Sequence, residues 1–200
     1  MKKFVFFFAF FFVVFSVFSQ DIKDSTRFEL SSVNISAGKS YLSSGYCLSV
    51  GFKGLNSNTS VTLLKDKIFV NHVYPIAKIK TAIGPSLGYF QNVPLAGAIA
   101  SFSPYKFLST THWAGYSFGD PGAKMDINPS FLFLLNKVTL KIKDFKPYYV
   151  CIKFMEFKLK HVVGLSYQYQ MTENIHVYSD AGYDFTNEEQ LLKIGVIWRN

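Results

Sequence analysis

Charged residues are scarce in this chain. Asp, Glu, Lys and Arg make up 17% of its 200 residues, against about 25% in a typical soluble domain. Aromatic residues reach 18%, and a chain with so many large apolar side chains can bury enough surface to fold. The composition therefore excludes an intrinsically disordered protein. The absence of a fixed-period repeat also excludes a solenoid or a propeller.

Cysteine is nearly absent as well, with only Cys47 and Cys151. Two cysteines do not make a disulfide-rich scaffold. Cys151 lies in an apolar, strand-like run, where a small apolar residue is the simplest interpretation. A disulfide between the two stays open, because the sequence does not give the distance between them.

Helical periodicity is missing after the first twenty residues. No stretch of ten residues there repeats its apolar side chains at the 3.6-residue spacing of a helix. Instead, eleven runs of roughly 8 to 14 residues are separated by turn signals, of which GDPG (residues 119–122) is a strong one. These runs predict an all-β protein.

Apolar and polar residues alternate within many of these runs, and KLKHVVGLSYQYQM (residues 158–171) is a clear case. Alternation places the two kinds of side chain on opposite faces of a strand. One face would carry Leu159, Val163, Leu165, Tyr167 and Tyr169, and the other Ser166, Gln168 and Gln170. Roughly the last sixty residues repeat this pattern as up-and-down strands with short turns.

The first twenty residues form a separate segment. Lys2 and Lys3 precede an unbroken apolar run from Phe4 to Val14, and Ser19 supplies a small residue near its end. This arrangement is typical of a secretory signal peptide at residues 1–19, cut after Ser19. The apolar stretch is short for a spanning helix, which needs about 20 residues, and an uncleaved anchor is the alternative. Residues 20–200 are predicted to be one exported domain.

The exported part is basic. Without Lys2 and Lys3 it has 19 basic and 13 acidic residues, a formal charge of +6. Nucleic-acid-binding proteins share this sign, but export and the scatter of the lysines argue against that class. A basic surface or lumen that faces acidic lipid head groups or anionic solutes fits better.

Alternation alone does not say which face is buried. A soluble sandwich or a lipocalin-type barrel turns its apolar side chains inward, whereas an outer-membrane barrel turns them outward to lipid. The length of the runs favours the membrane barrel, because a tilted strand needs about 9–11 residues to cross a bilayer. The polar rows also suit a wet lumen. Aromatic residues near the ends of the runs would form interfacial girdles, and they are Tyr46, Tyr89, Phe90, Tyr148, Tyr149, Tyr167, Tyr169, Tyr183, Phe185 and Trp198.

With a signal peptide, alternating strands, short turns and a final strand near its C-terminus, the chain resembles a small bacterial outer-membrane β-barrel protein. The resemblance covers nearly all of residues 20–200 and is one of pattern, without a subfamily motif. The family usually ends in an aromatic residue that the assembly machinery recognises, whereas Trp198 lies two residues before the end here.

The resemblance implies an antiparallel up-and-down transmembrane β-barrel of eight to ten strands. It implies a monomer in the bacterial outer membrane. Its partners would be membrane lipids, including lipopolysaccharide, and the outer-membrane assembly machinery, but no nucleic acid. The expected role is structural, adhesive or that of a narrow channel. The alternative is a soluble periplasmic or secreted β-barrel or sandwich that binds an apolar ligand, and the third possibility is a lipid-modifying barrel enzyme.

One segment contains the residue types of a hydrolase: His112, Ser117 and Asp120 lie within nine residues. A Ser–His pair within hydrogen-bond reach could deacylate a lipid. On a strand, however, positions 112 and 117 point to opposite faces. The segment also lacks the His-x-Ser spacing of outer-membrane lipid A deacylases. The simpler interpretation is a strand that runs into a turn, with Trp113 and Tyr116 at the membrane interface.

The remaining histidines, His72, His161 and His176, stand singly without metal-ligand spacing. His161 lies on the apolar face of its run and is interpreted as an interfacial residue. We therefore predict no catalytic residue, no cofactor and no metal site, and we do not expect an enzyme.

Overall fold

The structure is a computed structural model, and it describes residues 28–90, 93–117, 132–154 and 158–200. The predicted signal peptide at residues 1–19, the GDPG turn and Asp120 lie outside the described residues.

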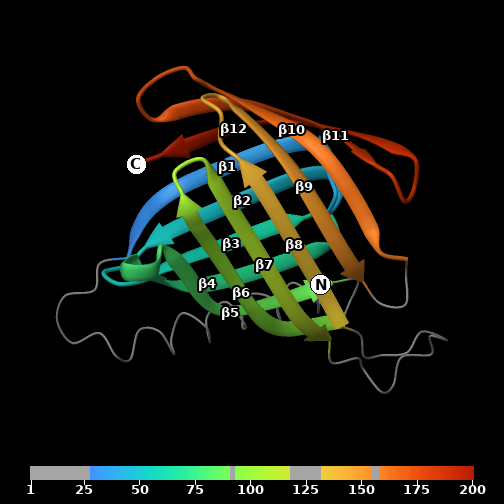
Figure 1. Cartoon of the computed structure of the whole chain (residues 1–200). Helices are drawn as coiled ribbons and strands as arrows, with labels where there is room; N and C mark the ends of the chain where they lie inside the picture. The colour runs from blue at the N-terminus through green and yellow to red at the C-terminus, as the bar shows by residue number, and fades with distance from the viewer. Residues whose placement is uncertain (1–27, 91–92, 118–131, 155–157) are drawn as a thin grey trace, which may run out of the picture.

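The described residues form twelve strands that close into a single antiparallel barrel (Figure 1). Each strand pairs with its neighbours in sequence, and the last strand pairs with the first. The strands are β1 (Glu29–Lys39), β2 (Ser44–Lys53), β3 (Asn58–Leu64), β4 (Lys67–Ile76), β5 (Thr81–Phe90), β6 (Val93–Tyr105), β7 (Leu108–Ser117), β8 (Leu132–Leu140), β9 (Phe145–Phe154), β10 (Lys160–Gln170), β11 (Ile175–Asp184) and β12 (Glu189–Arg199). One 3₁₀ turn, η1 (Ala77–Ile79), follows β4. In the described part of the chain, no helix is long and apolar enough to span a bilayer. The predicted fold class, an all-β up-and-down transmembrane barrel, is confirmed.

The predicted count of eight to ten strands is wrong. The sequence from Ser60 to Tyr74 reads as a single run, but Lys65 and Asp66 form a turn that divides it into β3 and β4. This turn has neither glycine nor proline, so it gives no turn signal. Short connections elsewhere leave enough residues for twelve strands.

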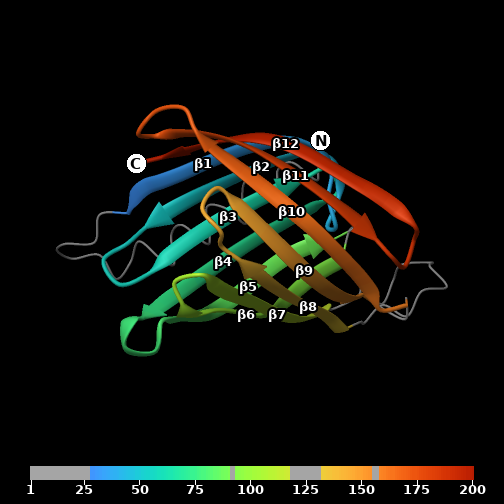
Figure 2. The same ribbon diagram turned by 45° about the horizontal axis from the view of Figure 1, so that its top comes forward.

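The predicted orientation of the two faces is confirmed on β10. Val163, Leu165 and Tyr169 are 47%, 43% and 58% exposed, whereas Val162 is fully buried in the barrel. The apolar face of the alternation therefore points outward. Figure 2 shows the wall of β10 to β12 on the opposite side of the barrel from β6 and β7.

The same apolar belt continues around the barrel. Exposed large aliphatic residues include Ile35, Ile83, Leu87, Leu132, Val138, Leu192, Ile194 and Val196. A soluble protein rarely exposes so much contiguous apolar surface, so the belt speaks against a soluble barrel with an apolar ligand. Six of the predicted girdle aromatics are exposed on it: Tyr46, Tyr89, Tyr149, Tyr169, Tyr183 and Phe185. For Tyr148 the prediction is wrong, because its side chain is buried inside the barrel.

The two ends of the barrel differ in their connections. One end, here called the terminal end, carries the start of β1, the end of β12 and five connections of two to four residues. The other end, here called the long-loop end, includes the connection from β7 to β8, residues 118–131. These names locate the layers of the lumen described below.

Candidate functional site in the barrel lumen

Apolar side chains fill the lumen toward the long-loop end. They are Leu64, Phe69, Leu95, Trp113, Phe133, Leu135, Val150, Ile152, Val162 and Leu191, each 9% exposed or less. The rings of Phe69 and Trp113 meet edge to face with centroids 4.5 Å apart, and those of Trp113 and Phe133 do so at 4.8 Å. Such contacts hold aromatic side chains in fixed geometry. Because Val150 and Val162 are fully buried, this apolar layer closes the lumen at their level.

The turn between β1 and β2, residues 40–43, folds into this layer. Its backbone closes through a hydrogen bond from the amide of Ser40 to the carbonyl of Ser43, at 2.8 Å. Tyr41 and Leu42 pack against the apolar cluster. The ring of Tyr41 lies 6.1 Å from that of Tyr148 on β9. The turn thus reaches strands that Figure 1 shows in front of β1 and β2.

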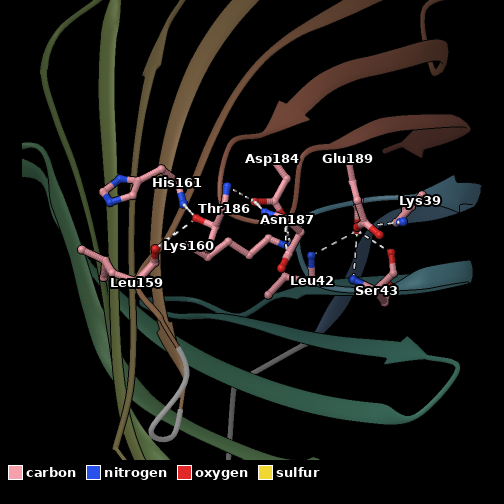
Figure 3. Close-up of polar contacts among 11 residues, drawn as sticks. Lys39, Leu42, Ser43, Leu159, Lys160, His161, Asp184, Thr186, Asn187 and Glu189 are labelled. Carbon is pink, nitrogen blue, oxygen red and sulfur yellow. Dashed lines mark hydrogen bonds and ion pairs between the residues drawn. The ribbon is translucent and has the colours of Figure 1, made fainter.

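Polar contacts from three other strands hold the turn in place. Lys137 of β8 donates from Nζ to the Tyr41 hydroxyl at 3.3 Å. Lys67 of β4 donates from Nζ to the carbonyl of Leu42 at 2.7 Å. On β12, Glu189 forms an ion pair with Lys39 at 2.8 Å, and Figure 3 shows its carboxylate beside Leu42 and Ser43.

Cationic side chains gather in the lumen toward the terminal end. Lys146 of β9 donates from Nζ to Oε1 of Gln168 at 2.5 Å. Arg199, Lys141 and Lys137 lie close enough to Lys146 to repel its charge. The carboxylate of Asp144 attracts the Lys146 ammonium group and so opposes this repulsion.

Acidic groups in the middle of the lumen have partners of their own. Asp180 accepts a hydrogen bond from the hydroxyl of Tyr148 at 2.5 Å. Lys193 stands opposite Asp180 in the pairing of β11 with β12, and its Nζ lies 5.4 Å from the centre of the Tyr178 ring. These contacts leave Lys137, Lys146 and Arg199 as an excess of positive charge.

The rim at the long-loop end is braced by a buried carboxylate. Asp184 is fully buried, with Lys160 Nζ 2.6 Å from its Oδ2 and the Asn187 side-chain amide 2.8 Å from the same atom. Thr186 accepts at Oγ1 from the amide of His161 at 3.1 Å (Figure 3). This network ties the turn after β11 to the start of β10 and keeps the rim in shape.

The structure does not bring the predicted hydrolase residues together. His112 points outward, where its Nδ1 lies 2.8 Å from Oδ1 of Asn136 and its Nε2 lies 3.1 Å from Oγ1 of Thr110. Ser117 points into the barrel and is fully buried. His112 and Ser117 therefore lie on opposite faces of β7, as their odd spacing predicts. Asp120 lies outside the described residues.

The predicted position of Trp113 at the membrane interface is wrong. The Trp113 side chain shares the inward face of β7 with Ser117, and only 6% of it is exposed. Tyr116 is 46% exposed and points outward as predicted.

The single histidines are held by separate partners. Nδ1 of His72 lies 2.7 Å from Oγ1 of Thr59, and the His72 ring packs against that of Tyr74. His161 faces outward, on the face where the sequence places it, and its Nδ1 lies 2.6 Å from the Tyr149 hydroxyl. In the described ranges, no group of three or more His, Cys, Asp and Glu could hold a metal ion.

The two cysteines lie on opposite faces of the wall. Cys47 of β2 faces inward, next to Leu64 in the pairing of β2 with β3 and packed against the apolar cluster. Cys151 of β9 stands opposite His161 in the outward row. Both are free, so the disulfide that the sequence left open does not form within the barrel.

Sequence reasoning missed the inward turn at residues 40–43. The available signal was an aromatic residue, Tyr41, within the polar stretch GKSYLSSG. The cations of the lumen were partly visible, because Lys137 and Lys141 belong to the polar row of an alternating run.

Comparison with known proteins identifies the fold. No protein-family model and no curated protein matches the sequence. A KdgM porin is similar in structure, with a TM-score of 0.58 at 12% identity over 86% of this chain and 99% of that one. A KdgM porin in complex with disordered oligogalacturonate gives a TM-score of 0.56 at 12% identity, with the same coverage. The chain therefore has the fold of bacterial outer-membrane β-barrel porins.

Proposed function

We propose that this protein is a narrow channel of the bacterial outer membrane for small anionic solutes. The observation that carries the proposal is the excess of positive charge in the lumen, formed by Lys137, Lys146 and Arg199. A lumen lined by charge of one sign concentrates ions of the opposite sign and speeds their entry.

The outer wall supports a position in a membrane. Its apolar belt would contact membrane lipids, including lipopolysaccharide, and the exposed tyrosines would lie at the interfaces. Barrels of this type have short periplasmic turns and longer extracellular loops. The terminal end would therefore face the periplasm. We propose a monomer that the outer-membrane assembly machinery inserts.

The nature of the solute follows from charge. One porin of similar fold has been solved with oligogalacturonate, an acidic oligosaccharide. In this chain, Lys146 and Arg199 would offer charge-assisted hydrogen bonds to a carboxylate or a phosphate. Because the apolar layer closes the other half of the lumen, conduction requires part of that layer to move, and the path so opened would be narrow.

Ion selectivity in planar lipid bilayers tests the proposal. With equal citrate on both sides, to open the turn described below, the reversal potential in a KCl gradient should show a preference for chloride, and Lys146→Glu should reduce it. Lys153→Glu is the matched control, because Lys153 lies on the same strand but faces outward, opposite Leu134. Cation selectivity of the unmodified protein, or equal effects of the two variants, would contradict an anion channel.

A filled structural barrel is the second candidate. The fully buried Val150 and Val162 in the lumen favour it. A barrel of this kind would pass no current, even after the closing turn is changed as described below. We propose no lipid-modifying activity, because His112 and Ser117 lie on opposite faces of β7.

A further inference from the structure

We propose that the turn at residues 40–43 is the gate of this channel, and that an anion bound at Lys137 opens it by displacing Tyr41. The inference rests on the proposed channel function. It deepens that function, because it assigns an anion-binding site and a response to its occupation. The site is the space that the Tyr41 hydroxyl now occupies beside the Lys137 ammonium group.

Lys137 is held by neutral partners. Its Nζ donates to the Tyr41 hydroxyl at 3.3 Å and lies 5.2 Å from the centre of the Tyr41 ring and 4.5 Å from that of Tyr148. Among the described residues, Lys137 has no ion pair. A hydroxyl and two aromatic faces stabilise an ammonium group less than a carboxylate does, because a carboxylate adds the attraction of a full negative charge to its hydrogen bond. An anion would therefore replace Tyr41 at Lys137.

The approach to this site runs through the basic half of the lumen. Lys146 and Arg199 lie on the side of the terminal end, and Lys137 is close enough to Lys146 to repel it. An anion that neutralises Lys137 also relieves this repulsion. The cations thus form a continuous group that would attract a multivalent anion up to the turn.

The turn is the part of the closing layer that can move. Tyr41 and Leu42 are carried by a turn, whereas the other apolar side chains of the layer are fixed on strands. At the base of the turn, Gly38 and Gly45 pair with each other and have φ angles of +128° and +107°. These are backbone conformations that glycine adopts readily. A change of φ and ψ at a few such residues is how hinges move.

The contacts of the turn with β4 and β12 are the hydrogen bond from Lys67 Nζ to the Leu42 carbonyl, at 2.7 Å, and the ion pair of Lys39 with Glu189 at its base. The ion pair between Lys39 and Glu189 has side chains that are 44% and 43% exposed. Exposed pairs of this kind contribute roughly 0–1 kcal/mol. The hydrogen bond from Lys137 to Tyr41 is thus a main polar contact between the turn and β8.

Pulsed EPR distances test the movement directly. Spin labels are placed at Ser43→Cys on the turn and at Leu140→Cys on the outward face of β8, in a protein whose native Cys47 and Cys151 are serine. The folded protein in lipid nanodiscs is titrated with sodium citrate, and sodium chloride of equal ionic strength is the control. Citrate should shift the distance distribution to a second, separate population, and sodium chloride should not.

Three variants identify the site of action. Lys137→Gln should abolish the response to citrate, whereas Lys153→Gln, on the outer wall, should leave it intact. Tyr41→Phe should show the second population at lower citrate concentration, because the hydroxyl that competes with the anion is gone. An unchanged distance distribution at saturating citrate would overturn the proposal, and so would a full response in Lys137→Gln. A shift in gel mobility between unheated and boiled samples checks that each variant is folded.

Conductance separates this inference from the channel function. Tyr41→Ala should raise the single-channel conductance severalfold and keep the sign of the ion selectivity. If citrate moves the turn but no variant conducts, the channel function fails and the anion-responsive turn stands. If the channel is anion-selective but the turn does not move, the gate fails and the channel function stands.

Discussion

Replacing Gly164 by alanine should destabilise the barrel by about 3 to 5 kcal/mol. Gly164 faces the lumen on β10, and the Tyr148 ring of the paired strand lies across it. An added Cβ would lie 2.3 Å from both Cζ and the hydroxyl oxygen of Tyr148. The ring would have to move, and overpacking of this kind typically costs about 1–3 kcal/mol. Movement would also break the hydrogen bond from Tyr148 to Asp180, and bonds to charged groups contribute about 1.5–3 kcal/mol.

The measurement is the urea midpoint of reversible unfolding from lipid vesicles, with the slope of the transition as a check that the same surface is exposed. Gly115→Ala is the matched control, because Gly115 also faces the lumen. Its added Cβ would come no closer than 3.2 Å to the side chain of Leu95, which can give way. We expect a loss below about 1 kcal/mol there.

A double-mutant cycle tests whether the Tyr148 ring is the cause. In a Tyr148→Ala background the space above Gly164 is empty, so Gly164→Ala should cost little. The coupling between the two sites should then account for most of the loss. An equal loss in both backgrounds would refute the steric argument.

Two further predictions concern the two faces of the wall. Leu165→Lys should destabilise the folded barrel by about 2–4 kcal/mol, since it places a charge near the middle of the outward apolar belt. Ser166→Lys is the control and should cost much less, because this side chain points into the lumen. Equal urea midpoints for the two variants would show that the faces are assigned wrongly. Because Cys47 and Cys151 point to opposite faces, the full chain should migrate identically in denaturing gels with and without reductant, and a faster unreduced band would reveal an intramolecular disulfide.

Much of the fold could be predicted because lipid and lumen impose different chemistry on alternate residues. On β10, Leu165 and Ser166 differ so clearly that the sequence alone places them on opposite faces, and the length of the runs then favours lipid on the side of Leu165. The strand count failed at Lys65 and Asp66, where the chain reverses within two polar residues. Polar residues also occupy the lumen-facing positions inside strands. In the sequence, a turn of two polar residues therefore looks the same as the continuation of a strand.

The interior of the barrel could not be predicted, for a related reason. Where the lumen is apolar, both faces of a strand are apolar and alternation disappears. On β7, the inward Trp113 and the outward Tyr116 are both aromatic. Aromatic side chains suit an interfacial girdle and a packed lumen equally. Only the closure of the barrel, which fixes the phase of every strand, tells the two apart.

The same closure makes the lumen cations informative. Lys137, Lys146 and Arg199 project into a confined space where Lys137 and Arg199 both repel Lys146, and repulsion between like charges destabilises a fold. The wall does not require charge at this level, since Ser166 stands opposite Lys146 in the pairing of β9 with β10. Polar residues that break the local rules of stability are expected at functional sites. A mobile anion can supply the missing negative charge, so the arrangement favours a lumen that an anionic solute enters and leaves.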